Sequence, residues 1–164
     1  MTVSIALEGS KELQAALREA SADVRRAAAD VVKATGVKLR TDAIKSIKNG
    51  PASGRTYTHK FYRTKNGKLA QGEKRVPHTA SAPGQPPMAD TGRLHNSITF
   101  DMIGPLTATV GTHIVYGLYL EYGTRPGPDG KGGIAARPWL RPAAEKQRAQ
   151  FQKRLEAAIS GALR

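Results

Sequence analysis

The sequence predicts an α+β fold in a single domain, residues 1–164, with a small antiparallel sheet packed against a long N-terminal helix and an amphipathic C-terminal helix. Three observations lead to this prediction. Apolar residues alternate in short runs, as in half-buried strands, and recur at helical spacing towards both ends of the chain. A basic stretch without apolar periodicity separates these patterns. Finally, 164 residues with 39% apolar content suit one modest core.

The composition narrows the possible functions. The chain has no cysteine, which excludes thiol catalysis and cysteine-ligated zinc. Its 26 Lys and Arg against 13 Asp and Glu give a net charge of +13, which favours polyanions as neighbours. No stretch of about 18 uninterrupted apolar residues occurs, and the start has no charged leader segment. We therefore expect a soluble protein with no membrane contact that is not exported by the general route.

The N-terminal part predicts a short strand followed by a long helix. Alternating apolar residues over 3–7 indicate the strand. Ser10 is a suitable N-cap, and apolar residues then recur at spacings of four and three, which indicates a helix over 11–48. Unbroken, this helix would be about 57 Å long at 1.5 Å per residue. That exceeds the width of a small domain, so we expect a bend at Thr35-Gly36.

The middle of the chain is basic and lacks apolar periodicity. Residues 49–89 are rich in Gly, Pro, Ser and Thr, and we expect an extended, mobile loop that is either disordered or functional. Asn66-Gly67 also suggests a hairpin. The candidate contacts to DNA or to a protein partner are the seven basic residues of this segment, Arg55, Lys60, Arg63, Lys65, Lys68, Lys74 and Arg75.

Regular patterns return after the basic segment. Asp90 or Thr91 is expected to cap a short helical turn. Apolar residues then alternate over 98–110 on both sides of Gly104-Pro105, which predicts a β-hairpin.

Two further helices are predicted downstream of this hairpin. Tyr116, Tyr119 and Leu120 share one face of a short helix that Gly123 ends. The last helix is amphipathic, and Pro142 lies in its first turn, where proline is tolerated. Its apolar face consists of Phe151, Leu155, Ala158, Ile159 and Ala162.

The stretch "VYGLYLEYGTRP", residues 115–126, places Tyr116, Tyr119 and Tyr122 around a single carboxylate, Glu121. Such a cluster suits a catalytic pocket, a stacking surface for nucleic acid, or a joint between structural elements. The four histidines lie at least seventeen residues apart, and none has metal-ligand spacing to a second ligand. No catalytic, cofactor or metal site is therefore predicted. We interpret the tyrosines as packing and contact residues, because a phenol buries a large ring and keeps one end wet.

Three motifs follow one another along the chain, "P-x-x-x-T-G-x-L-x-x-S-I", "Y-x-x-Y-L-E-Y-G-T" and "R-P-W-L-R-P-A". Their succession resembles the gene-product-ten-like tail-component family of long-tailed bacteriophages and prophages. Members of this family are called tail-completion, head-tail joining or minor capsid proteins. The matching positions are Pro87, Thr91, Gly92, Arg93, Leu94, Ser97 and Ile98 in the first motif, Tyr116, Tyr119, Glu121, Tyr122, Gly123 and Thr124 in the second, and Arg137, Pro138, Trp139, Leu140, Arg141 and Pro142 in the third.

The resemblance implies a structural virion protein, with no catalytic residue and no cofactor. Such a subunit would assemble as a homo-oligomeric ring in the neck, between connector or stopper proteins and tail-terminator or tail-tube proteins. The subunit would reach the virion from the host cytoplasm, and the lumen of the ring would face DNA. We expect residues 51–89 to order on assembly.

Two other functions are kept as alternatives. One is a basic nucleic-acid-binding protein acting through residues 51–89. The other is a small hydrolase that uses Glu121. For the structural function we predict instead that Glu121 caps a helix or pairs with an arginine such as Arg125 or Arg137.

Overall fold

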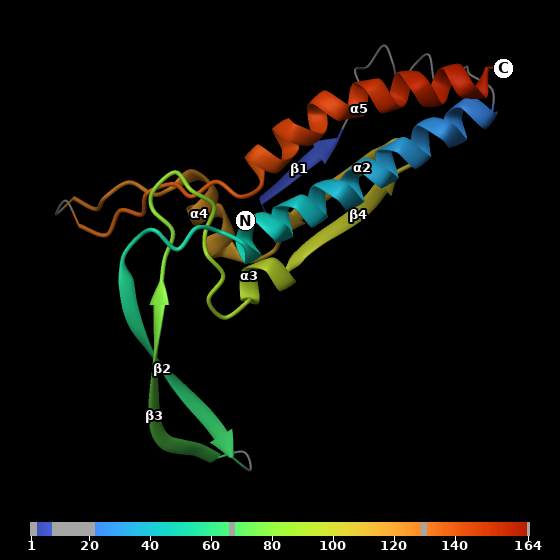
Figure 1. Cartoon of the computed structure of the whole chain (residues 1–164). Coiled ribbons are helices and arrows are strands. Elements are labelled where there is room, and N and C mark those ends of the chain that lie inside the picture. The colour runs from blue at the N-terminus through green and yellow to red at the C-terminus, as the bar shows by residue number, and fades with distance from the viewer. Residues whose placement is uncertain (1–2, 8–21, 66–67, 129–130, 164) are drawn as a thin grey trace.

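The computed structural model describes residues 3–7, 22–65, 68–128 and 131–163 of the chain (Figure 1). Its elements follow in the order β1 (Val3–Leu7), α2 (Ala22–Lys48), β2 (Thr56–Lys65), β3 (Lys68–Thr79), α3 (Arg93–Asn96), β4 (Ile98–Gly104), β5 (Thr107–Thr112), α4 (Val115–Tyr122) and α5 (Arg141–Ala162). The predicted α+β fold is confirmed. Within the described residues, no helix has an apolar stretch long enough to cross a membrane.

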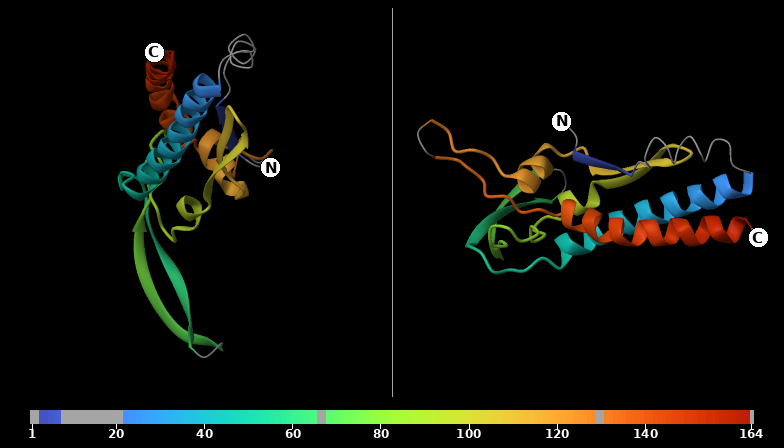
Figure 2. Two further views of the ribbon diagram at one scale, coloured as in Figure 1. Left: turned by 90° about the vertical axis from the view of Figure 1, so that its right-hand side faces the viewer. Right: turned by 90° about the horizontal axis from the view of Figure 1, so that it is seen from above.

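The main sheet has the strand order β1-β5-β4, and both pairs are antiparallel. Helix α2 packs against β5 and β4, and α5 runs alongside α2 in the opposite direction (Figure 2). The predicted strand over 3–7 and the predicted hairpin over 98–110 are confirmed. This hairpin pairs Ile98 with Thr112 and turns after Gly104. We refer to the main sheet with helices α2, α3, α4 and α5 as the body.

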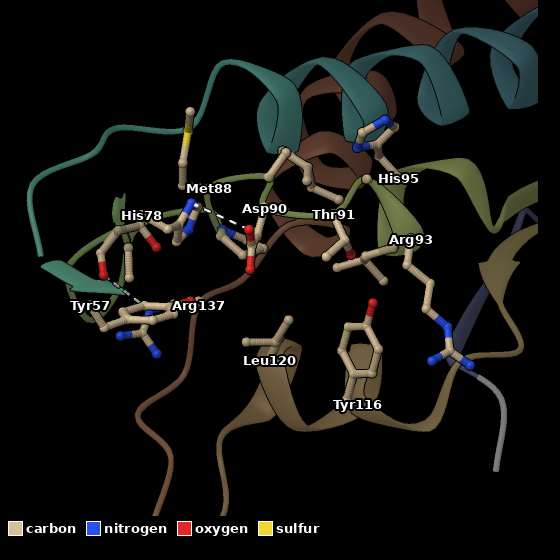
Figure 3. Close-up of a pocket in the computed structure, with 17 residues that line it drawn as sticks. Tyr57, His78, Met88, Asp90, Thr91, Arg93, His95, Tyr116, Leu120 and Arg137 are labelled. Carbon is tan, nitrogen blue, oxygen red and sulfur yellow. Dashed lines mark hydrogen bonds and ion pairs between the residues drawn. The ribbon is translucent and has the colours of Figure 1, made fainter. Parts of the chain in front are cut away.

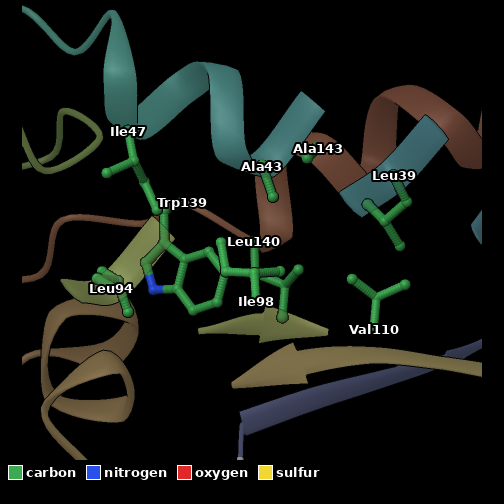
Figure 4. Packing of buried hydrophobic residues seen from close by; sticks show 9 residues of the cluster. All are labelled: Leu39, Ala43, Ile47, Leu94, Ile98, Val110, Trp139, Leu140 and Ala143. Atoms are coloured by element: carbon green, nitrogen blue, oxygen red, sulfur yellow. The ribbon is translucent and has the colours of Figure 1, made fainter. Parts of the chain in front are cut away.

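The core of the body lies where α2, the sheet and the start of α5 meet (Figure 4). Trp139 is its largest member and is fully buried. Burying an apolar side chain of this size contributes about 2–3 kcal/mol or more. The other buried members are Leu39, Ala43, Ile47, Leu94, Ile98, Val110, Leu140 and Ala143. A second, smaller cluster joins the far ends of the two long helices through Val24, Ala28 and Leu155.

Helix α2 runs without interruption through Thr35 and Gly36, where a bend was expected. Gly36 is buried, and a Cβ atom at this position would overlap the ring of Phe100 on β4. The glycine therefore allows the helix to approach the sheet closely, and it does not end the helix. Residues 11–21, which were predicted to form the first part of this helix, and their predicted N-cap Ser10 lie outside the described residues.

Strands β2 and β3 form a long antiparallel hairpin, which we call the hairpin arm (residues 56–79). Figures 1 and 2 show that the arm extends away from the body. Lys65 pairs with Lys68, so the prediction of a hairpin around Asn66-Gly67 is confirmed, although those two residues lie outside the described ones. The expectation of an extended loop is wrong for the arm. Its apolar periodicity is missing because a projecting two-stranded ribbon has no core to face.

The predicted cap of the helical turn is wrong. Helix α3 has Gly92 as its N-cap, with φ of 79° and no side-chain capping bond. Glycine adopts this left-handed conformation without the steric cost that a Cβ atom imposes. By contrast, the expected end of α4 is confirmed, because Gly123 has φ of 73° and its N–H donates to the Tyr119 carbonyl at 2.9 Å. Pro142 lies in the first turn of α5 as predicted.

Candidate functional site

The carboxylate of Glu121 is buried at the junction between α4 and α5, where the side chain is only 2% exposed. Its Oε2 atom accepts hydrogen bonds from the main-chain N–H groups of Trp139 at 2.8 Å and Leu140 at 2.9 Å. Its Oε1 atom accepts one from Arg141 at 2.9 Å. The first N–H groups of a helix lack partners within the helix and carry partial positive charge. Glu121 therefore caps α5 from another helix.

The indole of Trp139 closes the same junction from the other side. Its Nε1–H donates to the carbonyl of Gly117 on α4 at 3.1 Å. A Cβ atom on Gly117 would lie 2.7 Å from Thr112 Cγ2 and 3.2 Å from Leu94 Cδ1. Glycine at this position thus lets α4 lie directly on the core. Together, the capping carboxylate and the indole join α4 to α5 across about twenty residues of intervening chain.

Of the two roles predicted for Glu121, capping is confirmed and pairing with an arginine is not observed. Arg137 instead donates from Nε to the Ser81 carbonyl at 3.2 Å, and Arg125 is exposed. The hydrolase alternative loses its catalytic group, because a buried carboxylate that accepts three main-chain hydrogen bonds cannot reach a substrate.

The tyrosines of α4 lie on the surface of the body. Tyr116 is 38% exposed, Tyr119 42% and Tyr122 65%. Partial burial raises the pKa of Tyr116, an effect that the charge of Arg93 opposes. Ile134 is also exposed and lies beside the end of α4, where its N–H donates to Thr124 Oγ1 at 3.0 Å. The three tyrosines are thus only partly packed against the body, and their role in subunit contact stays a prediction.

A pocket of about 520 Å³ opens between the root of the hairpin arm, α3 and α4 (Figure 3). Its lining includes Thr91, Gly92, Arg93 and Leu94 from the first predicted motif, with Tyr116 from the second. The fold thus brings residues of two motifs together in one pocket. Their positions in the sequence did not show that they meet.

The root of the arm adds Tyr57 and His78 to the polar lining. His78 Nδ1 lies 3.8 Å from Asp90 Oδ1, and the rings of Tyr57 and His78 meet edge to face at 5.3 Å. Burial raises the pKa of Tyr57, with a further contribution from the charge of Asp90, whereas burial lowers the pKa of His95. Sequence reasoning missed His78, because its partners lie twelve or more residues away.

The seven candidate basic residues all lie on the hairpin arm or at its root. Arg55 is exposed and directly precedes β2. The register places Lys60 opposite Arg75 and Lys65 opposite Lys68. The other two are Arg63 on β2 and Lys74 on β3. Among the described residues, no group of three His, Asp or Glu side chains is placed to hold a metal.

The fold and the junction define an α+β protein in which a packed body carries a projecting hairpin arm. Residues 11–123 match the family described as "Bacteriophage HK97-gp10, putative tail-component", and the chain belongs to this family. The protein therefore has a structural role in a bacteriophage. The matched range contains the first predicted motif and all of the second except Thr124, and the third, over 137–142, lies beyond it. No curated protein and no solved structure matches the chain, and the comparisons give no support to a free nucleic-acid-binding function.

Proposed function

We propose that the protein is a tail-completion or head-tail joining component that forms part of the virion neck. The observation that carries this proposal is a projecting basic hairpin on a body that belongs to a phage tail-component family. A joining protein must contact proteins on more than one side. A compact body with a long arm suits that task, because the body can pack within one layer while the arm reaches the next.

Assembly as a homo-oligomeric ring is part of this proposal. The exposed side chains of Tyr119, Tyr122 and Ile134 provide an apolar surface next to the end of α4. Aromatic side chains of this kind are enriched in protein interfaces. In a closed ring, one such surface on each subunit meets a different surface on the next.

The arm supports contact with a further partner or with DNA. A two-stranded hairpin alone is marginally stable in water, and like charges directly opposite each other weaken it. Lys60 opposite Arg75 and Lys65 opposite Lys68 are two such pairs. An anionic neighbour would relieve this repulsion, so the arm is expected to order on assembly. Equal protease sensitivity of the arm in the free subunit and in the assembled neck would contradict that expectation.

The neck function is tested by deleting the gene from the phage or prophage that encodes the chain. We expect filled heads and separate tails to accumulate, and a plasmid copy to restore joined particles. The protein should also be a stoichiometric component of purified particles. Normal yields of infectious particles without the gene would rule out the neck function.

The ring is tested separately by electron microscopy of purified protein and of particles. Tyr122→Glu should abolish oligomers, because it places a charge in the proposed subunit contact. Ala149→Glu is a matched control, since it introduces the same charge at an exposed position on α5. Equal oligomer populations in the two variants would show that the α4 surface is not the contact.

A further inference from the structure

The pocket at the root of the hairpin arm has two kinds of wall. Leu120, Met88 and the ring of Tyr116 provide apolar surface, and Figure 3 shows Leu120 and Tyr116 rising from α4 towards Thr91. The lining also includes two arginines, Arg93 at an exposed position beside Tyr116 and Arg137 near Tyr57 (Figure 3). A pocket of about 520 Å³ is large enough for a few side chains of a peptide segment.

The lining carries two permanent positive charges, on Arg93 and Arg137, and one carboxylate. Arg137 is held in place by the bond from its Nε to the Ser81 carbonyl, and a guanidinium has four further N–H groups. Asp90 is the one carboxylate among the lining residues, and it already faces His78 at 3.8 Å. The permanent charges of the lining therefore sum to a net positive charge, which complements an anionic ligand.

Two buried polar atoms in the pocket wall have no hydrogen-bond partner within the described part of the chain. They are Ser81 Oγ and His95 Nδ1, and Ser81 is only 1% exposed. Buried polar groups in native proteins almost always have a partner, and an exception calls for a missing one. Both atoms are shielded from solvent, so they would reach a bound carboxylate only after the wall rearranges around it.

We infer that this pocket binds an acidic peptide segment that also carries apolar side chains, supplied by a neighbouring virion protein. The guanidinium groups would take the carboxylates, and the wall of α3 and α4 would take the apolar side chains. DNA is the less suitable ligand, because its phosphates would leave the apolar wall unused. This inference rests on the proposed structural function, and it assigns the kind of partner that the site recognises.

The position of the pocket gives the contact a second consequence. Tyr57 and His78 belong to the arm, whereas Leu120 and Tyr116 belong to the body, so one bound segment would touch both. Binding would therefore fix the direction of the arm relative to the body. Docking of the partner and ordering of the arm become one event.

The test measures binding of a fluorescent acetyl-Leu-Glu-Leu-Glu-Leu-Glu-amide peptide to the full chain at physiological salt. A matched peptide with Gln in place of Glu separates charge from apolar contact. Arg93→Gln combined with Arg137→Gln should weaken binding of the Glu peptide by roughly tenfold or more. The control variant, Lys33→Gln with Lys38→Gln, removes the same charge from the exposed side of α2 and should change binding by less than about threefold.

A further variant guards against loss of folding in the arginine double variant. Thr91→Trp fills the mouth of the pocket from an exposed position and leaves the charges intact, so it should also abolish binding. Thermal unfolding confirms that each variant is folded, and Arg93→Gln alone replaces the double variant if that one unfolds.

Several results would overturn the inference. They are equal binding to the pocket and control variants, equal binding of the Gln peptide, a Glu-peptide Kd above about 1 mM, or displacement by a short DNA duplex that depends on the same arginines. These outcomes are separate from the gene-deletion test. If gene deletion blocks joining but the peptide does not bind the pocket, the proposed neck function stands. Only the inferred peptide ligand is then wrong.

Discussion

The body and the hairpin arm of this protein are held together by different forces. In the body, Trp139 and eight smaller apolar residues are buried, and a capping carboxylate satisfies the start of α5. In the arm, β2 and β3 pair through a backbone ladder whose register places Lys60 opposite Arg75 and Lys65 opposite Lys68. We therefore expect contacts within the body to provide most of the free energy of unfolding. The arm is expected to gain stability from contact with a partner molecule.

This difference separates two kinds of mutation. Changes in the body should lower the free energy of unfolding, and they should affect assembly only by that route. Changes in the arm should leave the free energy of unfolding almost unchanged and act on assembly directly. Each prediction below uses one region as the control for the other.

The largest effect is expected for Glu121→Ala. The substitution leaves the N–H groups of Trp139, Leu140 and Arg141 without partners in a buried position, and charge-assisted hydrogen bonds are among the stronger ones. We expect a loss of about 3–5 kcal/mol in the free energy of unfolding, measured by urea denaturation.

Glu121→Gln sharpens this prediction. The amide keeps one acceptor oxygen but turns an NH2 group towards main-chain donors, so the loss should be about 1–3 kcal/mol. Arg125→Gln is the control, because Arg125 is exposed and was the alternative partner of Glu121. A stability of Glu121→Ala equal to that of the native chain would show that the cap is unimportant.

The next largest effect is expected for Gly117→Ala. The added Cβ atom would lie 2.7 Å from Thr112 Cγ2, so α4 would have to move away from the core and from the Trp139 indole. Overpacking of this kind costs about 1–3 kcal/mol. The matched control is Gly161→Ala, which meets open space on α5 and should be neutral or slightly stabilising. Identical melting temperatures for the two variants would contradict the close approach of α4.

The sequence predicted those elements of the body in which apolar residues recur at a regular spacing. The β4–β5 hairpin and α5 each bury one face, so apolar residues recur at the matching spacing. The arm was expected mainly as a loop because neither of its faces needs apolar residues. Gly36 was interpreted as a helix bend because a sequence does not show the Phe100 ring that approaches it.

The site was predicted in part for a similar reason. Glu121 stood out as a single acid among tyrosines, and a cap was one of the roles expected for it. Its partners could not be identified, since main-chain N–H groups have no signature in the sequence. The pocket was missed because it combines Tyr57, Leu120 and Arg137, which only the fold brings together.

A much smaller effect on stability is expected when the arm is shortened. Replacing residues 59–76 by Asn-Gly keeps the hydroxyl pair of Thr56 and Thr79 at 2.8 Å and the contact between Tyr57 and His78. The body should unfold within about 0.5–1 kcal/mol of the native chain, because no core residue is removed. The variant should nevertheless fail to restore joined heads and tails in the gene-deletion strain.

The same shortened variant decides between the two regions. A large loss of stability in urea would show that the arm is part of the cooperative fold of the body. Normal complementation would show that the arm has no part in assembly.

The smallest effect is expected from the pH dependence of His95. Burial lowers its pKa below the ordinary value of 6.5, and the charge of Lys48 adds to this shift. The unfolded chain therefore binds a proton more readily than the native chain. Stability due to His95 is complete above about pH 6.5 and is lost as the pH falls from there through the lowered pKa of the native state.

His95→Gln removes this titration while the other three histidines remain in both proteins and cancel in the comparison. The difference in free energy of unfolding between the native chain and His95→Gln should therefore shift against the native chain between pH 7.5 and pH 5. A difference independent of pH would show that His95 is as well solvated in the body as in the unfolded chain. Adding His95→Gln to the shortened-arm variant should give the same pH-dependent difference, because His95 belongs to α3 and this comparison also cancels the loss of His59 with the arm.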